Sequence, residues 1–283
     1  MVPKQRIFSK RPSFLQRKWS GLRSKMSELV EYTGDLTLFF GQTVYWLVHR
    51  GYQRDTLVVS CNNIGVLSLP VVMLTGVFIG MVLAVQSYTQ FRFVGLETRL
   101  GAMINMSLVR ELGPVLAATM LAGRIGSSVA AELGTMRVTE QIDALESMGT
   151  NAIHYLVVPR FLACMFLIPA LTVMADFMGV LGGAFYGILL LHIDWHHYWH
   201  YSQQFVGIFD VFMGIFKSVF FGMVIAVISC YQGFHCDAGA EGVGKAATKS
   251  FVISFVLILF MDLLLGIVLE SIYSMFWTPP NFF

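Results

Sequence analysis

Charged side chains are scarce in this sequence. Only 13% of its 283 residues are Asp, Glu, Lys or Arg, whereas 56% are hydrophobic; soluble domains average about 25% charged and about 45–50% apolar residues. This balance excludes an ordinary soluble domain and gives no sign of a nucleic-acid partner. Much of the apolar material lies in runs of the roughly 20 residues that a helix needs to cross a bilayer. We therefore expect an all-α, polytopic integral membrane protein.

Cysteines are few, and their spacing pairs none of them. The four cysteines contain no C-x-x-C motif, so we expect neither a disulfide framework nor a zinc site; small, buried packing residues are the simpler interpretation. The first thirty residues also lack the compact apolar segment and small-residue cleavage site of a signal peptide. We expect the N-terminus to remain in the mature protein, and we expect no metal or resident cofactor.

The chain is expected to contain two N-terminal segments and a membrane domain. Residues 1–26 form a basic extension without acidic residues, which would lie against anionic headgroups or remain a solvated tail. Residues 27–55 combine an apolar stripe at helical spacing with Glu28, Glu31 and Asp35, which is typical of a helix lying along the membrane surface. Residues 56–283 form the membrane domain, with about five spans expected at residues 64–88, 101–125, 161–191, 205–229 and 251–277.

The short loops predict the orientation, because cytoplasmic loops collect Lys and Arg. With the basic N-terminus inside, the inner loops at residues 126–160 and 234–250 carry Arg137, Arg160, Lys245 and Lys249. The outer loop at residues 191–204 has no Lys or Arg, although Arg92 and Arg99 in the first outer loop are exceptions. Five spans then place the N-terminus in the cytoplasm and the C-terminus on the opposite side.

One glycine-rich stretch superficially matches a nucleotide-binding motif. GAEGVGKAA, residues 239–247, fits most of the pattern G-x-x-x-x-G-K-[ST]. A P-loop joins a strand to a helix and has Ser or Thr after the lysine, but Ala246 follows Lys245 here and no α/β domain surrounds the stretch. We interpret it as an inner turn that leads into the last span, and not as an ATP site.

A short amphipathic helix is expected in the larger inner loop, at residues 131–149. Val138, Ile142 and Leu145 recur at helical spacing, and Gly149 suits a C-terminal cap. Periodicity alone leaves two interpretations equally open. The helix could pack on the protein's own inner face, or it could enter a groove on a partner.

The residues of this region resemble one known family. The run RELGPVLAATMLAGRIGSSVAAELGTMRVTEQIDALESMG, residues 110–149, is similar to the MlaE family, as are GVFIGMVLAVQSY at 76–88, PRF at 159–161 and GAEGVGKAAT at 239–248. Members of this family are permease subunits of ABC transporters that work with lipid-carrying MCE-domain proteins. The resemblance extends from about residue 58 to the C-terminus; it does not include the first thirty residues or so, and the 191–204 loop is particular to this chain.

The resemblance implies a transport subunit rather than an enzyme. It implies a homodimer, a separate cytoplasmic ATPase that holds ATP and magnesium, an MCE partner outside, and phospholipid as the cargo, in support of outer-membrane lipid asymmetry. The membrane would be a bacterial cytoplasmic membrane or a plastid envelope, and the lack of a Ser-rich transit peptide favours the bacterial one. The inner helix would be the coupling helix in the ATPase groove, through Glu132, Leu133, Met136, Arg137, Glu140, Ile142, Asp143 and Leu145. Spans one and two would help line a lipid cavity at the dimer interface, with candidate contacts Tyr88, Leu108, Arg110 and Glu111.

Ionisable groups within the spans require a partner, a polar cavity or a function, because each costs at least about 2.5 kcal/mol to insert. Arg110 and Glu111 are adjacent, so on a helix they point about 100° apart and each should find its own neighbour. Arg110 could meet a lipid phosphate or join an ion-pair network. The other candidates are Asp176, Asp210, Lys217, Asp262 and Glu270. Such carboxylates would also suit an ion-coupled secondary carrier, which is the alternative function.

Two further patterns carry weaker expectations. His192, His196 and His200 recur every four residues, but three successive turns of a helix do not close one metal site, and Asp194 is the only nearby acid. We expect a belt of aromatic and histidine side chains at the outer interface. Gly76 and Gly80 permit close approach of another helix, which the sequence does not identify.

Overall fold

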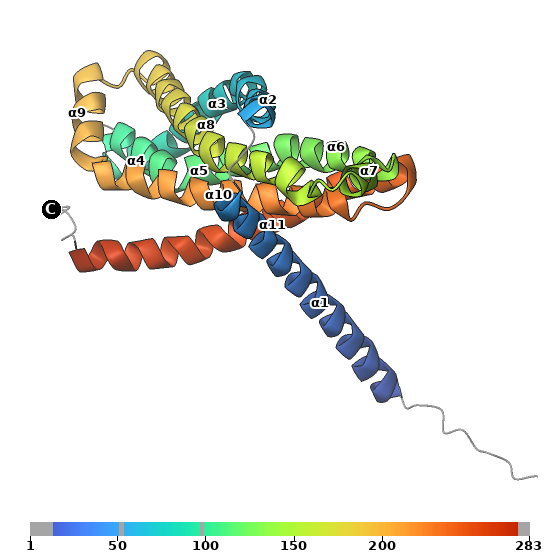
Figure 1. Ribbon diagram of the computed structural model, residues 1–283. Helices are drawn as coiled ribbons and strands as arrows, with labels where there is room; N and C mark the ends of the chain where they lie inside the picture. Colours follow the sequence, from blue (N-terminus) through green and yellow to red (C-terminus); the bar gives the residue numbers. More distant parts are fainter. Residues whose placement is uncertain (1–13, 51–53, 97–98, 277–283) are drawn as a thin grey trace, which may run out of the picture.

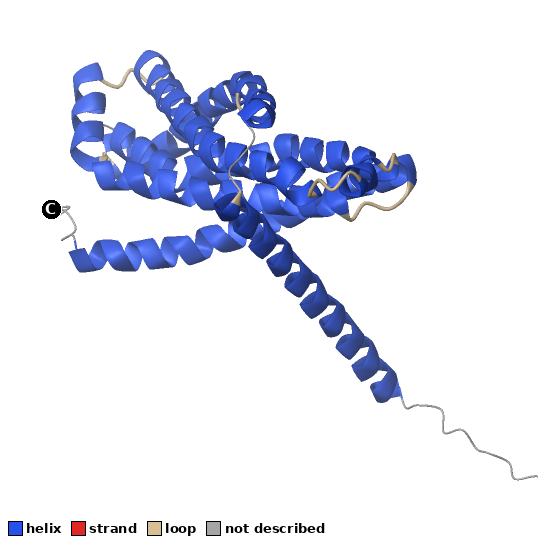
Figure 2. Ribbon diagram, in the orientation of Figure 1, coloured by secondary structure: helices blue, strands red, loops and turns tan. Residues whose placement is uncertain are grey.

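The computed structural model describes residues 14–50, 54–96 and 99–276, and within these ranges the regular secondary structure is entirely helical (Figures 1 and 2). Five helical segments are long and apolar enough to cross a membrane: Arg54–Phe93, Leu100–Val138, Ile153–Leu190, Ile208–Phe234 and Gly239–Met275. The expected all-α fold with five spans is confirmed. Figure 1 shows the spans running roughly side by side, with α9 at one end of the bundle and α7 at the other.

The first three spans are built from several helical pieces each. The first span comprises α2 (Arg54–Ile64), the 3₁₀ turn η1 (Val66–Ser68) and α3 (Leu69–Val94). The second comprises α4 (Leu100–Ser107), the π turn η3 (Leu108–Leu112), α5 (Gly113–Leu121), the π turn η4 (Ala122–Gly126) and α6 (Ser127–Val138). The third comprises the π turn η5 (Ile153–Val157), α8 (Val158–Phe185) and the π turn η6 (Tyr186–Leu190).

The remaining helices are uninterrupted. They are α1 (Phe14–His49), α7 (Gln141–Ser147), α9 (Trp195–Phe205), α10 (Ile208–Phe234) and α11 (Gly239–Phe276). Proline explains three of the interruptions in the spans, because Pro70, Pro114 and Pro159 stand in the first turn after η1, η3 and η5. A proline nitrogen donates no hydrogen bond, so a carbonyl in the preceding turn loses its usual partner. That turn then adopts a 3₁₀ or π hydrogen-bond pattern.

Helices α3 and α8 approach each other at their glycines. A Cβ atom on Gly80 would lie 1.9 Å from the carbonyl oxygen of Gly179, and one on Gly76 would lie 2.5 Å from that of Ala175. Side chains at these positions would force the helices apart, so the small residues permit backbone contact. The unidentified neighbour of Gly76 and Gly80 is therefore α8 of the same chain.

Helix α1 projects from the bundle (Figure 1) and is held by its second half. Phe39 and Thr43 are buried, and the hydroxyl of Tyr32 accepts a hydrogen bond from Gln232 Nε2 of α10 at 2.7 Å. The expected boundaries, 27–55, were wrong, because α1 begins within the expected basic extension and ends at His49. Residues 1–13 of that extension lie outside the described residues. The position of α1 along the membrane surface stays a prediction.

Two segments that were predicted to lie on the inner side differ from expectation in their helices. The GAEGVGKAA stretch is helical rather than a turn: α11 begins at Gly239, and an ion pair of Lys245 with Glu241 at 2.7 Å joins successive turns. The predicted helix at 131–149 is broken, since α6 ends at Val138 and α7 follows after Glu140, whose φ is +59°. The break turns Ile142 into the core, where its exposure is 1%.

The loop that was predicted to lie on the outer side also folds, as α9 (Trp195–Phe205). The carboxylate of Asp194 accepts hydrogen bonds from the backbone N–H groups of His196 and His197 at 3.1 and 3.2 Å, so it caps the helix. The rings of His196 and His200 stack 5.9 Å apart. The capping of α9 by Asp194 therefore accounts for an acidic residue at this position.

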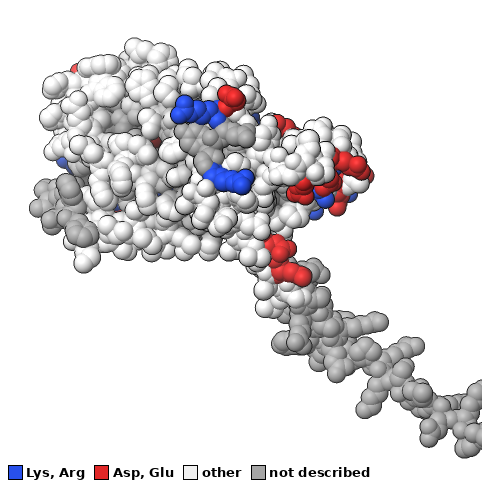
Figure 3. Space-filling model, viewed as in Figure 1, with Lys and Arg blue, Asp and Glu red and all other residues white. Residues whose placement is uncertain are grey.

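Charge separates along the bundle. In Figure 3 acidic side chains gather at the α7 end, basic and acidic side chains also lie near the middle of this face, and the part toward α9 is almost uncharged. Glu140, Asp143 and Glu146 are exposed at the α7 end. A broad uncharged surface is expected of a bundle that stands across a membrane, because charged side chains are costly in hydrocarbon.

Candidate functional site

Lys217 of α10 lies at the centre of a buried charged cluster. Its side chain has no exposed surface; its Nζ donates a hydrogen bond to Glu111 Oε2 at 2.6 Å and lies 3.0 Å from Asp262 Oδ1 of α11. A buried ammonium is costly unless carboxylates compensate it. The cluster therefore ties together the second, fourth and fifth spans.

Arg110 has a different partner from its neighbour Glu111. Its guanidinium pairs with Glu270 of α11 and lies over the ring of Tyr273, 5.4 Å from the ring centroid. The expectation that the two adjacent residues find separate neighbours is confirmed. Contact of Arg110 or Glu111 with lipid stays a prediction, and a phosphate at Arg110 would compete with Glu270.

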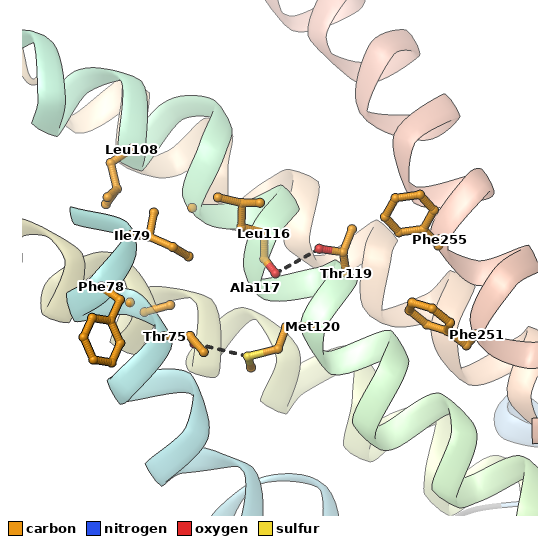
Figure 4. A pocket seen from close by; sticks show the side chains of 13 residues that line it. Thr75, Phe78, Ile79, Leu108, Leu116, Ala117, Thr119, Met120, Phe251 and Phe255 are labelled. Carbon is orange, nitrogen blue, oxygen red and sulfur yellow. Dashed lines mark hydrogen bonds between the residues drawn. The ribbon is translucent and has the colours of Figure 1, made fainter. Parts of the chain in front are cut away.

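An apolar cavity of about 440 Å³ lies between four spans (Figure 4). Its lining comes from α3, η3, α5, α8 and α11: Thr75, Gly76, Phe78, Ile79, Leu108, Gly113, Leu116, Ala117, Thr119, Met120, Ala175, Phe251 and Phe255. We call it the central cavity. Of the four predicted lipid contacts, Leu108 lines it, whereas Tyr88 packs on a separate cluster near α9.

The polar atoms of the central cavity are already engaged. The hydroxyl of Thr75 contacts Met120 Sδ at 3.1 Å and the carbonyls of its own helix, and that of Thr119 donates to the Leu116 carbonyl at 3.0 Å (Figure 4). A cavity whose hydroxyls are satisfied internally offers hydrocarbon contacts to an occupant. Its chemistry suits an acyl chain.

Comparison with known proteins then decides the family. The profile of the family described as Permease MlaE matches residues 57–268. The chain belongs to the MlaE permease family. A probable ABC transporter permease protein of Rickettsia bellii is 46% identical over 237 residues, which cover 84% of this chain and 92% of the relative.

More distant relatives of this MlaE permease are similar over most of their length. A probable ABC transporter permease protein of Synechocystis is 39% identical over 226 residues, 80% of this chain and 86% of the relative. The intermembrane phospholipid transport system permease protein MlaE of Haemophilus influenzae is 36% identical over 210 residues, 74% of this chain and 80% of the relative. This MlaE permease is thus a multi-pass membrane protein with the role of an ABC transporter permease, a transport subunit.

The predicted coupling residues of the permease fall into two groups. Leu133 and Ile142 are buried in the protein's own core, and Met136 and Leu145 are half-buried against it. The charged members lie further out: Glu132 accepts from Arg160 at 2.7 Å, Arg137 pairs with Asp143 across the break between α6 and α7, and Glu140 is exposed. The apolar side of α7 thus packs inward, and its acidic side is exposed.

Sequence reasoning missed Arg124. It stands in η4, within the run MLAGRIG, yet it was not counted among the intramembrane charges. A single cation at the end of an apolar run was a sufficient signal to include it. Phe251 and Phe255 are the residues of α11 that line the central cavity. No signal in the sequence identified them, because they are two of many apolar residues in the last span.

Proposed function

We propose that this chain is the membrane permease of an ATP-driven transporter that moves phospholipid between the bacterial inner membrane and an MCE-domain partner. The observation that carries the proposal is the central cavity, whose lining is apolar and whose hydroxyls are satisfied. The Haemophilus relative, an intermembrane phospholipid transport system permease protein, supports the same cargo. In this arrangement the N-terminus is cytoplasmic and the C-terminus periplasmic.

ATP and magnesium would be held by a separate ATPase. The exposed acids Glu140, Asp143 and Glu146 at the α7 end form the proposed docking face. Leu133 and Ile142, which pack into the bundle, would transmit a displacement of α7 to the spans. The acids would set the choice of partner and the rate of association more than the final affinity, as charges at interfaces generally do.

The permease is proposed to act as a homodimer. Much of α11 has large apolar side chains at its surface, including Phe255, Leu259 and Leu263. In a membrane, this apolar surface can pack against lipid acyl chains or against a second copy of the permease. Helix α11 also lines part of the central cavity. A second copy against α11 would enclose that cavity further.

The test is reconstitution of the permease with its ATPase and MCE protein. Transfer of a fluorescent phospholipid should require ATP and should persist when a protonophore removes the proton gradient. Transfer that follows the gradient and ignores ATP would instead support the ion-coupled carrier.

The docking face is tested by reversing its charge. The double variant Glu140→Lys and Asp143→Lys should lose the ATPase on purification and lose transfer. The matched control, Glu31→Lys with Asp35→Lys, reverses two exposed acids on α1 and should retain the ATPase. Equal retention by both variants would remove α7 from the interface.

A further inference from the structure

Arg124 of η4 is a partly exposed cation that forms no ion pair among the described residues. Its Nη1 atom is buried and has no hydrogen-bond partner among the described residues. The other arginines of the second span behave differently, because Arg110 pairs with Glu270 and Arg137 pairs with Asp143. A guanidinium has five N–H donors, and leaving a buried one unpaired is costly. Arg124 is itself partly exposed, so an anion from outside the chain can reach its guanidinium and satisfy these donors.

Arg124 lies on the α7 side of the middle of the second span, Leu100–Val138. It follows Leu100, the first residue of α4, by 24 positions, which at 1.5 Å per residue is about 36 Å. The hydrocarbon core of a bilayer is about 30 Å thick, so taking Leu100 as one boundary of that core puts Arg124 near the phosphate groups of the other. Helix α6 then continues the span to Val138, toward α7.

Arg124 also adjoins the central cavity. In the π turn η4, hydrogen bonds link residues five apart, so Arg124 lies one turn beyond Thr119, which lines the cavity (Figure 4). Its neighbour Gly123 is close to Phe251 of the same lining: a Cβ atom there would lie 3.4 Å from the ring. Arg124 is not itself part of the lining, so the cation stands one helical turn beyond the end of an apolar cavity. This combination matches an amphiphile with an acyl chain and an anionic head.

We propose that Arg124 binds the phosphate of a phospholipid whose acyl chain occupies the central cavity. This assignment rests on the proposed lipid transport and identifies Arg124 as the residue that recognises the lipid headgroup. A guanidinium holds phosphate oxygens through two parallel N–H donors, and no carboxylate of the described residues competes at this site, in contrast to Arg110. The lipid then enters head first toward the α7 end, the orientation of a lipid in the cytoplasmic leaflet.

The experiment uses two photoreactive lipids with the same chains. One is phosphatidylglycerol with a diazirine near the end of one acyl chain, and the other is the corresponding diacylglycerol, which lacks the phosphate. Each is added to the purified full-length permease, and crosslinked peptides containing residues 116–120 or 251–255 report occupancy of the cavity. Variants are compared only after thermal unfolding shows that they are folded.

Phosphatidylglycerol should crosslink the wild type more than diacylglycerol does. Arg124→Gln should reduce the phosphatidylglycerol crosslinks by about tenfold, the loss expected for one charge-assisted contact, and leave those of diacylglycerol unchanged. Arg124→Lys, which keeps the charge without the bidentate geometry, should reduce them less. The control Arg54→Gln removes an exposed arginine on α2 and should match the wild type.

Several outcomes would overturn the assignment. Arg124→Gln could leave the crosslinks unchanged while the dimer or the ATPase is lost, which would assign the cation to a carboxylate of a protein partner. Displacement of the lipid by an equal concentration of inorganic phosphate would show a site for the free anion. An equal loss with both lipids would indicate a packing defect. If the wild type crosslinks neither lipid, the proposed lipid transport fails; if it crosslinks phosphatidylglycerol irrespective of Arg124, only this inference fails.

Discussion

Replacing Lys217 by methionine removes the cation of the buried cluster and keeps a side chain of similar length. The variant leaves Glu111 and Asp262, whose side chains are 46% and 23% exposed, without the ammonium that compensates both. Breaking a buried ion pair by removing one partner costs about 3–5 kcal/mol, because the remaining charge stays uncompensated. Because both carboxylates keep part of their surface exposed, we expect the free energy of unfolding to fall by the lower end of that range, about 3 kcal/mol.

The assay is unfolding of the purified permease in mild detergent, followed by tryptophan fluorescence. The triple variant Lys217→Met, Glu111→Gln and Asp262→Asn removes all three charges, so it should recover most of the lost stability. Lys249→Met is the control: this lysine is exposed near the start of α11, and its replacement should change stability by less than about 0.5 kcal/mol.

Two results would refute this reasoning. If Lys217→Met costs no more than Lys249→Met, the ammonium is solvated in the folded permease and the cluster contributes little. If the triple variant is as unstable as the single one, the loss comes from packing around the lysine stem and not from uncompensated charge.

Two other expectations concern separate parts of the chain. Gly80→Ala places a Cβ atom 1.9 Å from the Gly179 carbonyl oxygen, so α3 and α8 must separate and the free energy of unfolding should fall by about 1–3 kcal/mol or more. The control Gly244→Ala adds a Cβ atom with nothing within 4 Å and should be neutral or stabilising. Equal unfolding midpoints for the two variants would contradict the close contact. Burial and the neighbouring Asp237 raise the pKa of the Cys236 thiol. Because the thiolate is the reactive form, alkylation of Cys236, mapped by mass spectrometry, should require a higher pH in the folded protein than in the denatured chain. Identical pH profiles for the two states would contradict this expectation.

Hydropathy predicted the spans well but not where their helices end. It detects the part of a helix that lies in hydrocarbon, so it placed the start of the last span near Phe251. The helix begins at Gly239, because polar residues such as Glu241 and Lys245 continue it outside the membrane. The break at Glu140 was also missed, since it depends on Ile142 turning into the core, which no local pattern specifies.

The candidate site was predictable only in its composition. The sequence identified Arg110, Glu111 and Lys217 as charges that need partners. It could not pair them, because Glu111 and Lys217 are 106 positions apart and meet only when the spans pack. The central cavity likewise arises from apolar residues that are ordinary by themselves and become a lining through the arrangement of four spans.

The glycine contact between α3 and α8 determines which part of the permease is free to move. Gly80 and Gly179 bring two backbones together without intervening side chains, so there are no rotamers that could absorb sliding of one helix past the other. We expect these two helices to behave as a stationary frame during the transport cycle. The displacement would then fall on α11, which is joined to its neighbours partly through the long side chains of Lys217 and Arg110. Long side chains can reorient while they stay paired. The main movement of the transport cycle would then be a rotation of α11 relative to the stationary pair α3 and α8.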